Sequence, residues 1–159
     1  MVVVSDTTVL IALGRIGLLW LLERLWGSVI IPEAVYQEVL KGLHGSREIT
    51  EAVNLGWLQI KSVNNQKMVR LLQGDLRGRG ECECIVLAEE TGAKAILTDD
   101  KKARKVALSA GVEVAGTLGL LVRATKEGIL TKQEAIDAVE SLIRQTSAFR
   151  KLLSRKQLS

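Results

Sequence analysis

The strongest constraint on the fold of this chain lies at residues 95–110, where a buried strand leads into a helix through two adjacent aspartates. Residues 95–97 are an apolar run typical of a buried strand, and the apolar spacing of residues 103–110 is typical of one helix face. Ligands of parallel α/β folds gather at the carboxyl ends of the strands. An aspartate is also an ordinary helix N-cap, but capping explains only one of Asp99 and Asp100. The stretch therefore predicts an α/β fold with a polar site at this turn.

The same alternation of short apolar runs and helical patterns continues along the whole chain. We expect strands at residues 2–5, 29–31, 57–63, 95–97 and 112–115. We expect helices in broken segments of 10–25, then at 33–41, 46–55, 65–73, 81–91, 101–110, 117–126, 131–145 and, as a final short helix, 147–157. This order predicts a three-layer α/β sandwich, in which a central, mostly parallel sheet is flanked by helices on both faces.

Length and composition limit the possibilities further. At 159 residues the chain is expected to form one domain, residues 1–159, with a helical tail from about residue 131. No apolar run reaches the roughly 18 residues of a membrane span, and the first residues lack the pattern of a signal peptide. Cys82 and Cys84 are too close together for a stabilising disulfide, so we expect two small core side chains in a cytoplasmic protein.

Basic residues gather at the start of the helix that follows Asp100. Cations at a helix N-terminus oppose the helix dipole at a cost of roughly 0.3–1 kcal/mol each, so their presence there favours facing carboxylates or phosphates over plain solvation. A loop rich in glycine and arginine, residues 74–80, adds further cations before the helix at 81–91. The residues that could hold an RNA backbone are Lys101, Lys102, Arg104, Arg77 and Arg79.

Acidic residues stand at four places near strand ends or beside apolar helix faces. Each has an ordinary structural explanation by itself, as a helix cap, an exposed boundary residue or a first-turn glutamate. Two carboxylates about 4 Å apart, however, repel by roughly 4 kcal/mol at an effective dielectric constant near 20, so several together are not expected for structural reasons alone. The four places are Asp6, Glu38, Glu81 and the pair Asp99–Asp100.

At the third place the sequence offers two glutamates, Glu81 and Glu83. On a helical wheel Glu81 shares a stripe with Cys84, Ile85 and Ala88, whereas Glu83 falls on the opposite side. A carboxylate on an apolar stripe is costly unless it is paired or binds a cation. The wheel therefore predicts that Glu81 faces the interior and that Glu83 faces water.

Carboxylates and water are the ligands that Mg²⁺ and Mn²⁺ prefer in proteins. One or two such ions can activate a water molecule and hold a phosphodiester for in-line displacement. This chemistry needs neither histidine nor a reactive cysteine, and the chain has a single histidine. If the acids converge in the fold, they predict a Mg²⁺- or Mn²⁺-dependent phosphodiester hydrolase.

Taken in order, five motifs resemble the PIN domain, the metal-dependent ribonuclease fold of VapC-type toxins. The resemblance runs from residue 2 to about residue 123 and is closest to a PIN-like branch with Gly-Glu at the third acid. Each motif alone is weak, but the ordered set is specific. The motifs are Val3-Val4-Ser5-Asp6-Thr7-Thr8-Val9-Leu10-Ile11, Ile31-Pro32-Glu33-Ala34-Val35-Tyr36-Gln37-Glu38-Val39, Gly80-Glu81-Cys82-Glu83-Cys84-Ile85-Val86-Leu87-Ala88, Ile96-Leu97-Thr98-Asp99-Asp100 with Ala103-Arg104, and Gly116-Thr117-Leu118-Gly119.

The resemblance implies a site for Mg²⁺ or Mn²⁺ lined by the four acidic places, with Thr7 or Thr98 helping to orient it. Many toxins of this kind carry aspartate where this chain has Glu81. The family spacing counted back from Gly92 nevertheless favours Glu81 over Glu83, in agreement with the helical wheel. The common fourth motif is Thr-x-Asp, which favours Asp100 over its neighbour. The catalytic and metal-binding residues that the resemblance implies are Asp6, Glu38, Glu81, Asp99 and Asp100.

The resemblance implies an endonuclease that cuts single-stranded RNA, most simply the toxin of a type II VapBC-like toxin–antitoxin system. It also implies a small VapB-like antitoxin as a partner and a homodimer, for which aliphatic surface helices such as residues 16–26 are suited. The alternative is a PIN-like fold kept as a binding or scaffold module with little or no catalysis. The nearly complete acidic set argues against that alternative.

Overall fold

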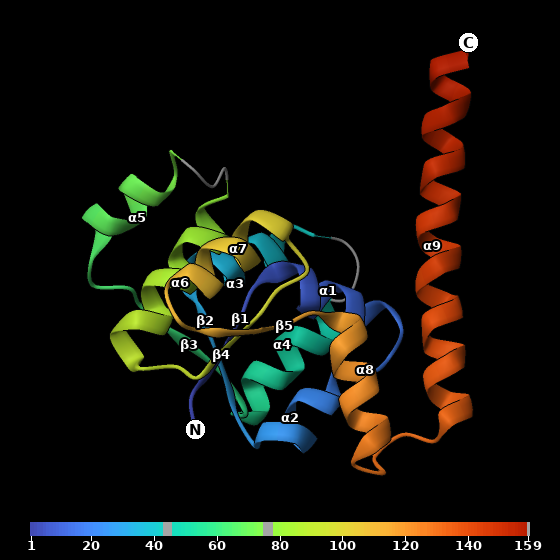
Figure 1. Cartoon of the computed structure of the whole chain (residues 1–159), viewed down its shortest axis with the longest axis horizontal. Helices are drawn as coiled ribbons and strands as arrows, with labels where there is room; N and C mark the ends of the chain where they lie inside the picture. Colours follow the sequence, from blue (N-terminus) through green and yellow to red (C-terminus); the bar gives the residue numbers. More distant parts are fainter. Residues whose placement is uncertain (43–45, 75–77, 159) are drawn as a thin grey trace. The chain divides into compact units, whose positions relative to one another are not determined.

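A five-stranded sheet lies at the centre of the first 117 residues, and all four of its strand pairings are parallel (Figure 1). The computed structural model describes residues 1–42, 46–74 and 78–158, with side chains described to residue 145. The strand order is β3-β2-β1-β4-β5. The strands are β1 (Val3–Ser5), β2 (Val29–Pro32), β3 (Leu58–Lys61), β4 (Ala95–Leu97) and β5 (Glu113–Ala115).

Helices connect these strands and cover both faces of the sheet, so the prediction of a PIN-like α/β sandwich is confirmed. In Figure 1, α6 and α7 lie on one side of the strands and α2 and α4 on the other. The described helices are α1 (Thr7–Arg15), α2 (Trp20–Trp26), α3 (Glu33–Lys41), α4 (Ser46–Leu55), α5 (Gln66–Leu72), α6 (Arg79–Thr91), α7 (Lys101–Ser109), α8 (Thr117–Lys126) and α9 (Lys132–Leu158).

The three central strands are buried along their whole length, which explains their sequences. Every residue of β1, β2 and β4 is buried, and nearly all of these side chains are aliphatic. Strands covered on both faces read as continuous apolar runs rather than alternating ones. The edge strands β3 and β5 are only partly buried. Sheet formation therefore follows from β-branched and aliphatic runs at the positions that the sequence predicts.

The chain reverses its direction across the sheet between β1 and β4. It starts with β1 in the middle, adds β2 and β3 on one side, and then crosses over to add β4 and β5 on the other. At such a switch point the connections leave β1 and β4 toward opposite sides, and a crevice opens beyond the carboxyl ends of the two strands. Asp6 directly follows β1, and Thr98 directly follows β4. The topology thus places the first and fourth acidic motifs at one crevice.

Residue contacts divide the chain into two compact units, Met1–Thr117 and Leu118–Ser159. In the second unit, a capping box begins α9: Thr131 Oγ1 accepts from Glu134 N at 3.1 Å, and Glu134 Oε1 accepts from Thr131 N at 3.0 Å. The prediction of two separate C-terminal helices is wrong, since α9 continues without a break to Leu158. That the whole chain forms a single domain stays a prediction.

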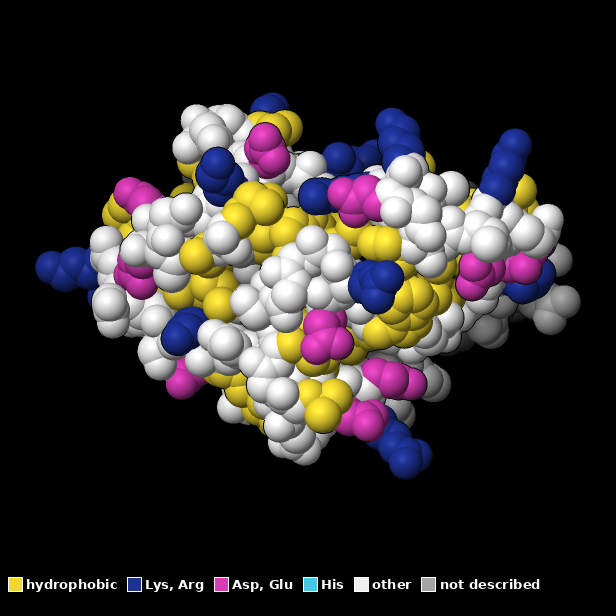
Figure 2. All heavy atoms as spheres, turned by 90° about the horizontal axis from the view of Figure 1, so that it is seen from below, with side chains coloured by type: hydrophobic (Ala, Val, Ile, Leu, Met, Phe, Trp, Pro, Cys, Tyr) yellow, Lys and Arg dark blue, Asp and Glu magenta, His cyan; other side chains and the backbone are white. Residues whose placement is uncertain are grey.

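Charged side chains of both signs are mixed on the surface that Figure 2 shows. Acidic and basic side chains alternate with hydrophobic ones on that face. The net positive charge of +4 therefore does not form a continuous basic patch on that face. Within the described residues, no helix combines the length and apolarity needed to cross a bilayer.

Candidate metal centre

Asp6 occupies the crevice between β1 and β4 and is almost completely buried, with 2% of its surface exposed. Its backbone N–H donates to Leu97 O at 2.9 Å, which continues the pairing of the two strands past their ends. Its Oδ1 caps α1 by accepting from Thr8 N at 2.9 Å and from Val9 N at 3.4 Å. Asp6 is therefore a helix cap and a candidate ligand at once, since capping uses only one of its oxygens.

Two threonine hydroxyls hold the Asp6 carboxylate from either side. Thr8 Oγ1 donates to Oδ1 at 2.7 Å, and Thr98 Oγ1 donates to Oδ2 in a short hydrogen bond. Each hydroxyl in turn accepts from a backbone N–H, Thr8 from Asp99 at 2.9 Å and Thr98 from Asp100 at 3.1 Å. Because an ionised carboxylate can only accept hydrogen bonds, both hydroxyl protons point to Asp6. The orientation of the Asp6 carboxylate is thus fixed, through the two hydroxyls, by the backbone that follows β4.

Burial raises the pKa of Asp6 from 3.8 to about 6, even though four hydrogen bonds from Thr98, Thr8 and Val9 act to lower it. Desolvation penalises the charged form of a carboxyl group, and the donors compensate for only part of that penalty. A cation close to Asp6 would remove the remaining cost. The Asp6 carboxylate is therefore a group whose ionisation and cation binding favour each other.

Glu38 reaches the same region from α3 and is exposed. Its Oε1 accepts from Gly80 N at 3.1 Å, and its Oε2 accepts from Thr7 Oγ1 at 2.9 Å. A Cβ on Gly80 would lie 2.3 Å from Oε1, so glycine is what lets the carboxylate approach the start of α6. A side chain at position 80 would therefore displace the Glu38 carboxylate from the start of α6, and Thr7 orients that carboxylate through its hydroxyl.

Glu81 has a buried carboxylate oxygen, Oε2, with no hydrogen-bond partner among the described residues. Burial raises the pKa of Glu81, and the negative charges of Glu38 and Asp100 raise it further. A Cβ on Gly78 would overlap the Glu81 carboxylate, so this group is packed tightly against the chain that enters α6. An unpartnered buried oxygen among other carboxylates is energetically unfavourable without a cation, which fits a metal ligand.

The prediction that Glu83 faces water is wrong, and Glu81, predicted to face the interior, is only half-buried. Glu83 is buried, its Oε2 pairs with Arg79 Nε at 3.1 Å, and its Oε1 accepts from Ala34 N at 3.2 Å. The wheel failed because α6 is buried on nearly all sides from Gly80 to Ala88, so no stripe of that helix marks its inner face. Glu83 is thus neutralised by an arginine and caps α3, whereas Glu81 has no cationic partner among the described residues.

Asp99 and Asp100 have different surroundings. Asp100 caps α7 through Ala103 N at 2.8 Å and lies close enough to Glu81 to raise its pKa. Both oxygens of Asp99 are used by Thr117, which donates its backbone N–H at 2.7 Å and its hydroxyl at 2.5 Å. A Cβ on Gly116 would lie 2.6 Å from Asp99 Oδ1, so this contact also depends on a glycine. Asp100 therefore has free oxygen capacity toward the other acids, and Asp99 links β4 to the start of α8.

Replacing each aspartate of this pair by asparagine should separate the two roles. We expect Asp100→Asn to weaken Mn²⁺ binding at least tenfold, because a charged oxygen donor near Glu81 is lost. We expect Asp99→Asn to lower stability by roughly 0.5–2 kcal/mol through a weakened cap, with Mn²⁺ affinity unchanged. Calorimetric titration and urea unfolding of both variants measure this. Equal losses of Mn²⁺ affinity in the two variants would contradict the assignment.

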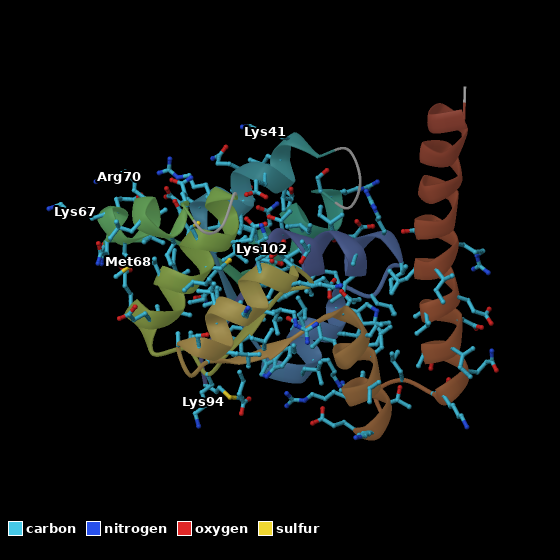
Figure 3. All side chains as sticks on the ribbon, turned by 45° about the horizontal axis from the view of Figure 1, so that its top comes forward. Lys41, Lys67, Met68, Arg70, Lys94 and Lys102 are labelled. Carbon is cyan, nitrogen blue, oxygen red and sulfur yellow. The ribbon has the colours of Figure 1, made fainter. Side chains whose placement is uncertain are left out.

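The candidate basic residues divide into two groups. Lys101, Lys102 and Arg104 are exposed in the first turns of α7, beside the crevice, and Figure 3 shows Lys102 on that helix. Arg79 is committed to Glu83 and also donates to Gln66 Oε1 at 3.2 Å. Arg77 lies outside the described residues. The α7 residues are therefore available to bind phosphate, while Arg79 first neutralises a buried acid.

Cys82 and Cys84 are buried and form no disulfide, as predicted. Cys84 Sγ donates to Ser5 O at 3.3 Å beneath the acids, and its complete burial raises the pKa of this thiol well above 9.0. A thiol that stays protonated is a poor nucleophile and a poor metal ligand. The chemistry of this site therefore has to come from the carboxylates.

The donor set fits a hard divalent cation such as Mg²⁺ or Mn²⁺ in chemistry and charge. It consists of carboxylate oxygens, and one of them, Glu81 Oε2, is buried without a partner among the described residues. In that part of the chain no three acidic, cysteine or histidine side chains already form an ion cage. Binding an ion through three carboxylates therefore requires side chains to turn, and the exposed side chain of Glu38 has room to do so.

The contact of Thr8 with Asp6 was not predicted from the sequence, and the available signal was the second threonine after Asp6. A hydroxyl two residues beyond a helix cap can return to the capping carboxylate, and Thr8 does so. The Glu83–Arg79 ion pair was not predicted either, and the spacing of four residues on one helix was its signal. Thr98, expected to orient the site, does contact Asp6.

In α/β proteins with an open parallel sheet, ligands bind beyond the carboxyl ends of the strands, at the switch point where Asp6 lies here. The family model for the PIN domain matches residues 2–157, so the chain belongs to the PIN-domain family. PIN domains are generally nucleases, and those nucleases typically use divalent metal ions. A search of curated proteins gave no match.

Proposed function

We propose that this PIN-domain protein is an endonuclease that hydrolyses phosphodiester bonds of single-stranded RNA with the help of Mg²⁺ or Mn²⁺. The proposal is supported by Glu81, which has a buried carboxylate oxygen without a partner among the described residues and lies close enough to Glu38 and Asp100 for their charges to raise its pKa. Asp6 lies at the end of β1, at the same switch point of the sheet. Such a group of acids is unfavourable without cations and suited to binding them.

In this proposal the four carboxylates hold the ion, which when bound supplies positive charge to the reacting phosphate and lowers the pKa of water. Thr8 and Thr98 keep the Asp6 carboxylate in one orientation through their hydroxyl hydrogen bonds. Glu38 is held by Thr7 and Gly80 at the open side of the crevice. The exposed cations Lys101, Lys102 and Arg104 bind the phosphates of the RNA strand next to the cleaved bond.

The sequence resemblance to VapC-type toxins extends the proposal to the protein's role. We propose that it is the toxin of a type II VapBC-like pair, that a small VapB-like antitoxin holds it inactive, and that it forms a homodimer. These partners rest on the resemblance and on exposed apolar residues such as Trp20 of α2, which is 45% exposed. Co-expression with the product of the neighbouring gene, followed by size-exclusion chromatography, tests them.

Cleavage of a labelled single-stranded RNA pool tests the nuclease proposal. The wild type should cut in Mg²⁺ or Mn²⁺ and should stop when EDTA is added. Glu81→Gln should lose this activity, whereas the matched control Glu89→Gln, an exposed residue on the same helix, should keep it. Absence of cleavage by the wild type in either metal would overturn the proposal and favour a binding module. Cleavage that persists in EDTA would overturn the role of the metal.

A further inference from the structure

A pocket opens directly beside the candidate metal centre. It has a volume of about 330 Å³ and lies between one face of α3 and the first turns of α6. Ala34, Gln37, Glu38 and Lys41 follow the i, i+3, i+4, i+7 spacing of a helix face, and Arg79 and Glu83 line the other side. Because Glu38 lines this pocket and also lies near Glu81, the pocket is next to the acidic group.

The guanidinium of Arg79 is fixed in this pocket from two directions. Its Nε is held at 3.1 Å by the buried carboxylate of Glu83, and its Nη2 donates to Gln66 Oε1 at 3.2 Å. The side chain nevertheless stays 61% exposed. A guanidinium that is held at its edges and open on its face provides a flat surface on which a nucleobase can stack.

Two further side chains offer polar groups that no other described residue uses. The amide of Gln37 and the ammonium of Lys41 are exposed, and neither makes a hydrogen bond or ion pair within the described residues. Figure 3 shows Lys41 projecting outward from the end of α3. An amide presents a donor and an acceptor to the edge of a base, and an ammonium attracts a phosphate.

The size of the pocket limits what it can hold. Small-molecule sites begin at roughly 300 Å³, so this volume suits a group as large as one nucleoside. A base in a duplex stays stacked and paired, whereas a base in a single strand can turn out into such a pocket. We infer that the pocket between α3 and α6 binds one unstacked nucleotide of a single-stranded RNA, next to the phosphate positioned at the acids. This inference rests on the proposed nuclease function and names how that site selects its substrate.

Binding of fluorescein-labelled single-stranded RNA, measured by fluorescence anisotropy in the non-cleaving Asp6→Asn background, tests the inference. Adding Gln37→Ala or Lys41→Ala should weaken binding about fivefold or more, and Lys41→Ala should also reduce the salt dependence of binding by about one counterion. Both positions are exposed, so the variants should fold. The matched control is Lys94→Ala, which removes an exposed lysine just before β4, at the opposite edge of the sheet (Figure 3).

A second arm compares single-stranded RNA, single-stranded DNA and duplex RNA, and a third measures which base wild-type enzyme and Gln37→Ala prefer beside the cut. A base preference that changes in Gln37→Ala supports the pocket. Unchanged binding in both pocket variants overturns the inference even if the wild type cleaves RNA with metal. Duplex binding that depends equally on Gln37 and Lys41 also overturns it. Pocket-dependent binding by a wild type that never cleaves would leave the pocket standing and refute the proposed hydrolysis.

Discussion

Asp6→Asn should reduce RNA cleavage by about 10²–10³-fold while leaving the fold intact. The change removes the negative charge of the most deeply buried acid among the described residues, and loss of one preorganised electrostatic group at a reaction centre typically costs about that much. The side-chain oxygen of the new asparagine can still cap α1, because it can accept from the same Thr8 and Val9 amides. The rate of cleavage of a defined single-stranded RNA, with circular dichroism as a check of folding, measures the effect.

The matched control for this change is Asp137→Asn. Asp137 is exposed on α9, where its carboxylate accepts only from Gln133 Nε2 at 2.8 Å among the described residues. It has no part in the proposed chemistry, so we expect unchanged cleavage. Full activity of Asp6→Asn, or equal losses in both variants, would show that Asp6 does not take part in cleavage.

The same Asp6→Asn change should stabilise the metal-free protein at neutral pH by about 3 kcal/mol. Burial raises the pKa of Asp6 from 3.8 to about 6, roughly two units, at about 1.36 kcal/mol for each unit. Between these two pKa values the folded state binds more protons than the unfolded state. Stability of the wild type is therefore lost as the pH rises from about 4 to about 6, and the loss is complete above that window. An asparagine side chain does not titrate, so the variant lacks this loss.

Urea unfolding in EDTA across pH 4–8 measures this difference. The unfolding free energies of wild type and variant should diverge with rising pH and then run parallel above about pH 7. Saturating Mn²⁺ should restore stability to the wild type in preference to the variant, because the ion binds the folded state with the ionised carboxylate. Parallel curves over the whole range would mean that Asp6 is not destabilised by burial.

Most of the fold could be predicted from the sequence because central strands and helices carry strong local patterns. The runs at β1, β2 and β4 are continuous and aliphatic since both faces of the sheet are covered. The C-terminal helices were less predictable. No proline or glycine lies between residues 145 and 147, so no strong helix-ending residue supports the predicted break, and α9 continues through it.

The candidate site was predictable at the level of motifs but not of hydrogen bonds. Asp6 and Asp100 stand at strand ends, and parallel strands bring such ends to one edge. The position of Glu83 could not be predicted from a wheel, because a helix that is buried all round has no polar face against which to read its direction. The capping of α8 by Asp99 depends on Thr117, which is 18 residues away and reaches Asp99 only in the folded sheet.

Titration of the metal-free protein with Mn²⁺ by calorimetry tests most directly whether these carboxylates form a metal centre. We compare the wild type with Glu81→Gln and Glu83→Gln. Both residues are glutamates of α6, but Glu83 pairs with Arg79, whereas Glu81 has a carboxylate oxygen without a partner among the described residues. If the carboxylates form a metal centre, we expect the wild type to bind Mn²⁺, Glu81→Gln to weaken this binding at least about tenfold, and Glu83→Gln to leave the Mn²⁺ affinity unchanged. Undetectable Mn²⁺ binding by the wild type, or a loss confined to Glu83→Gln, would contradict this expectation.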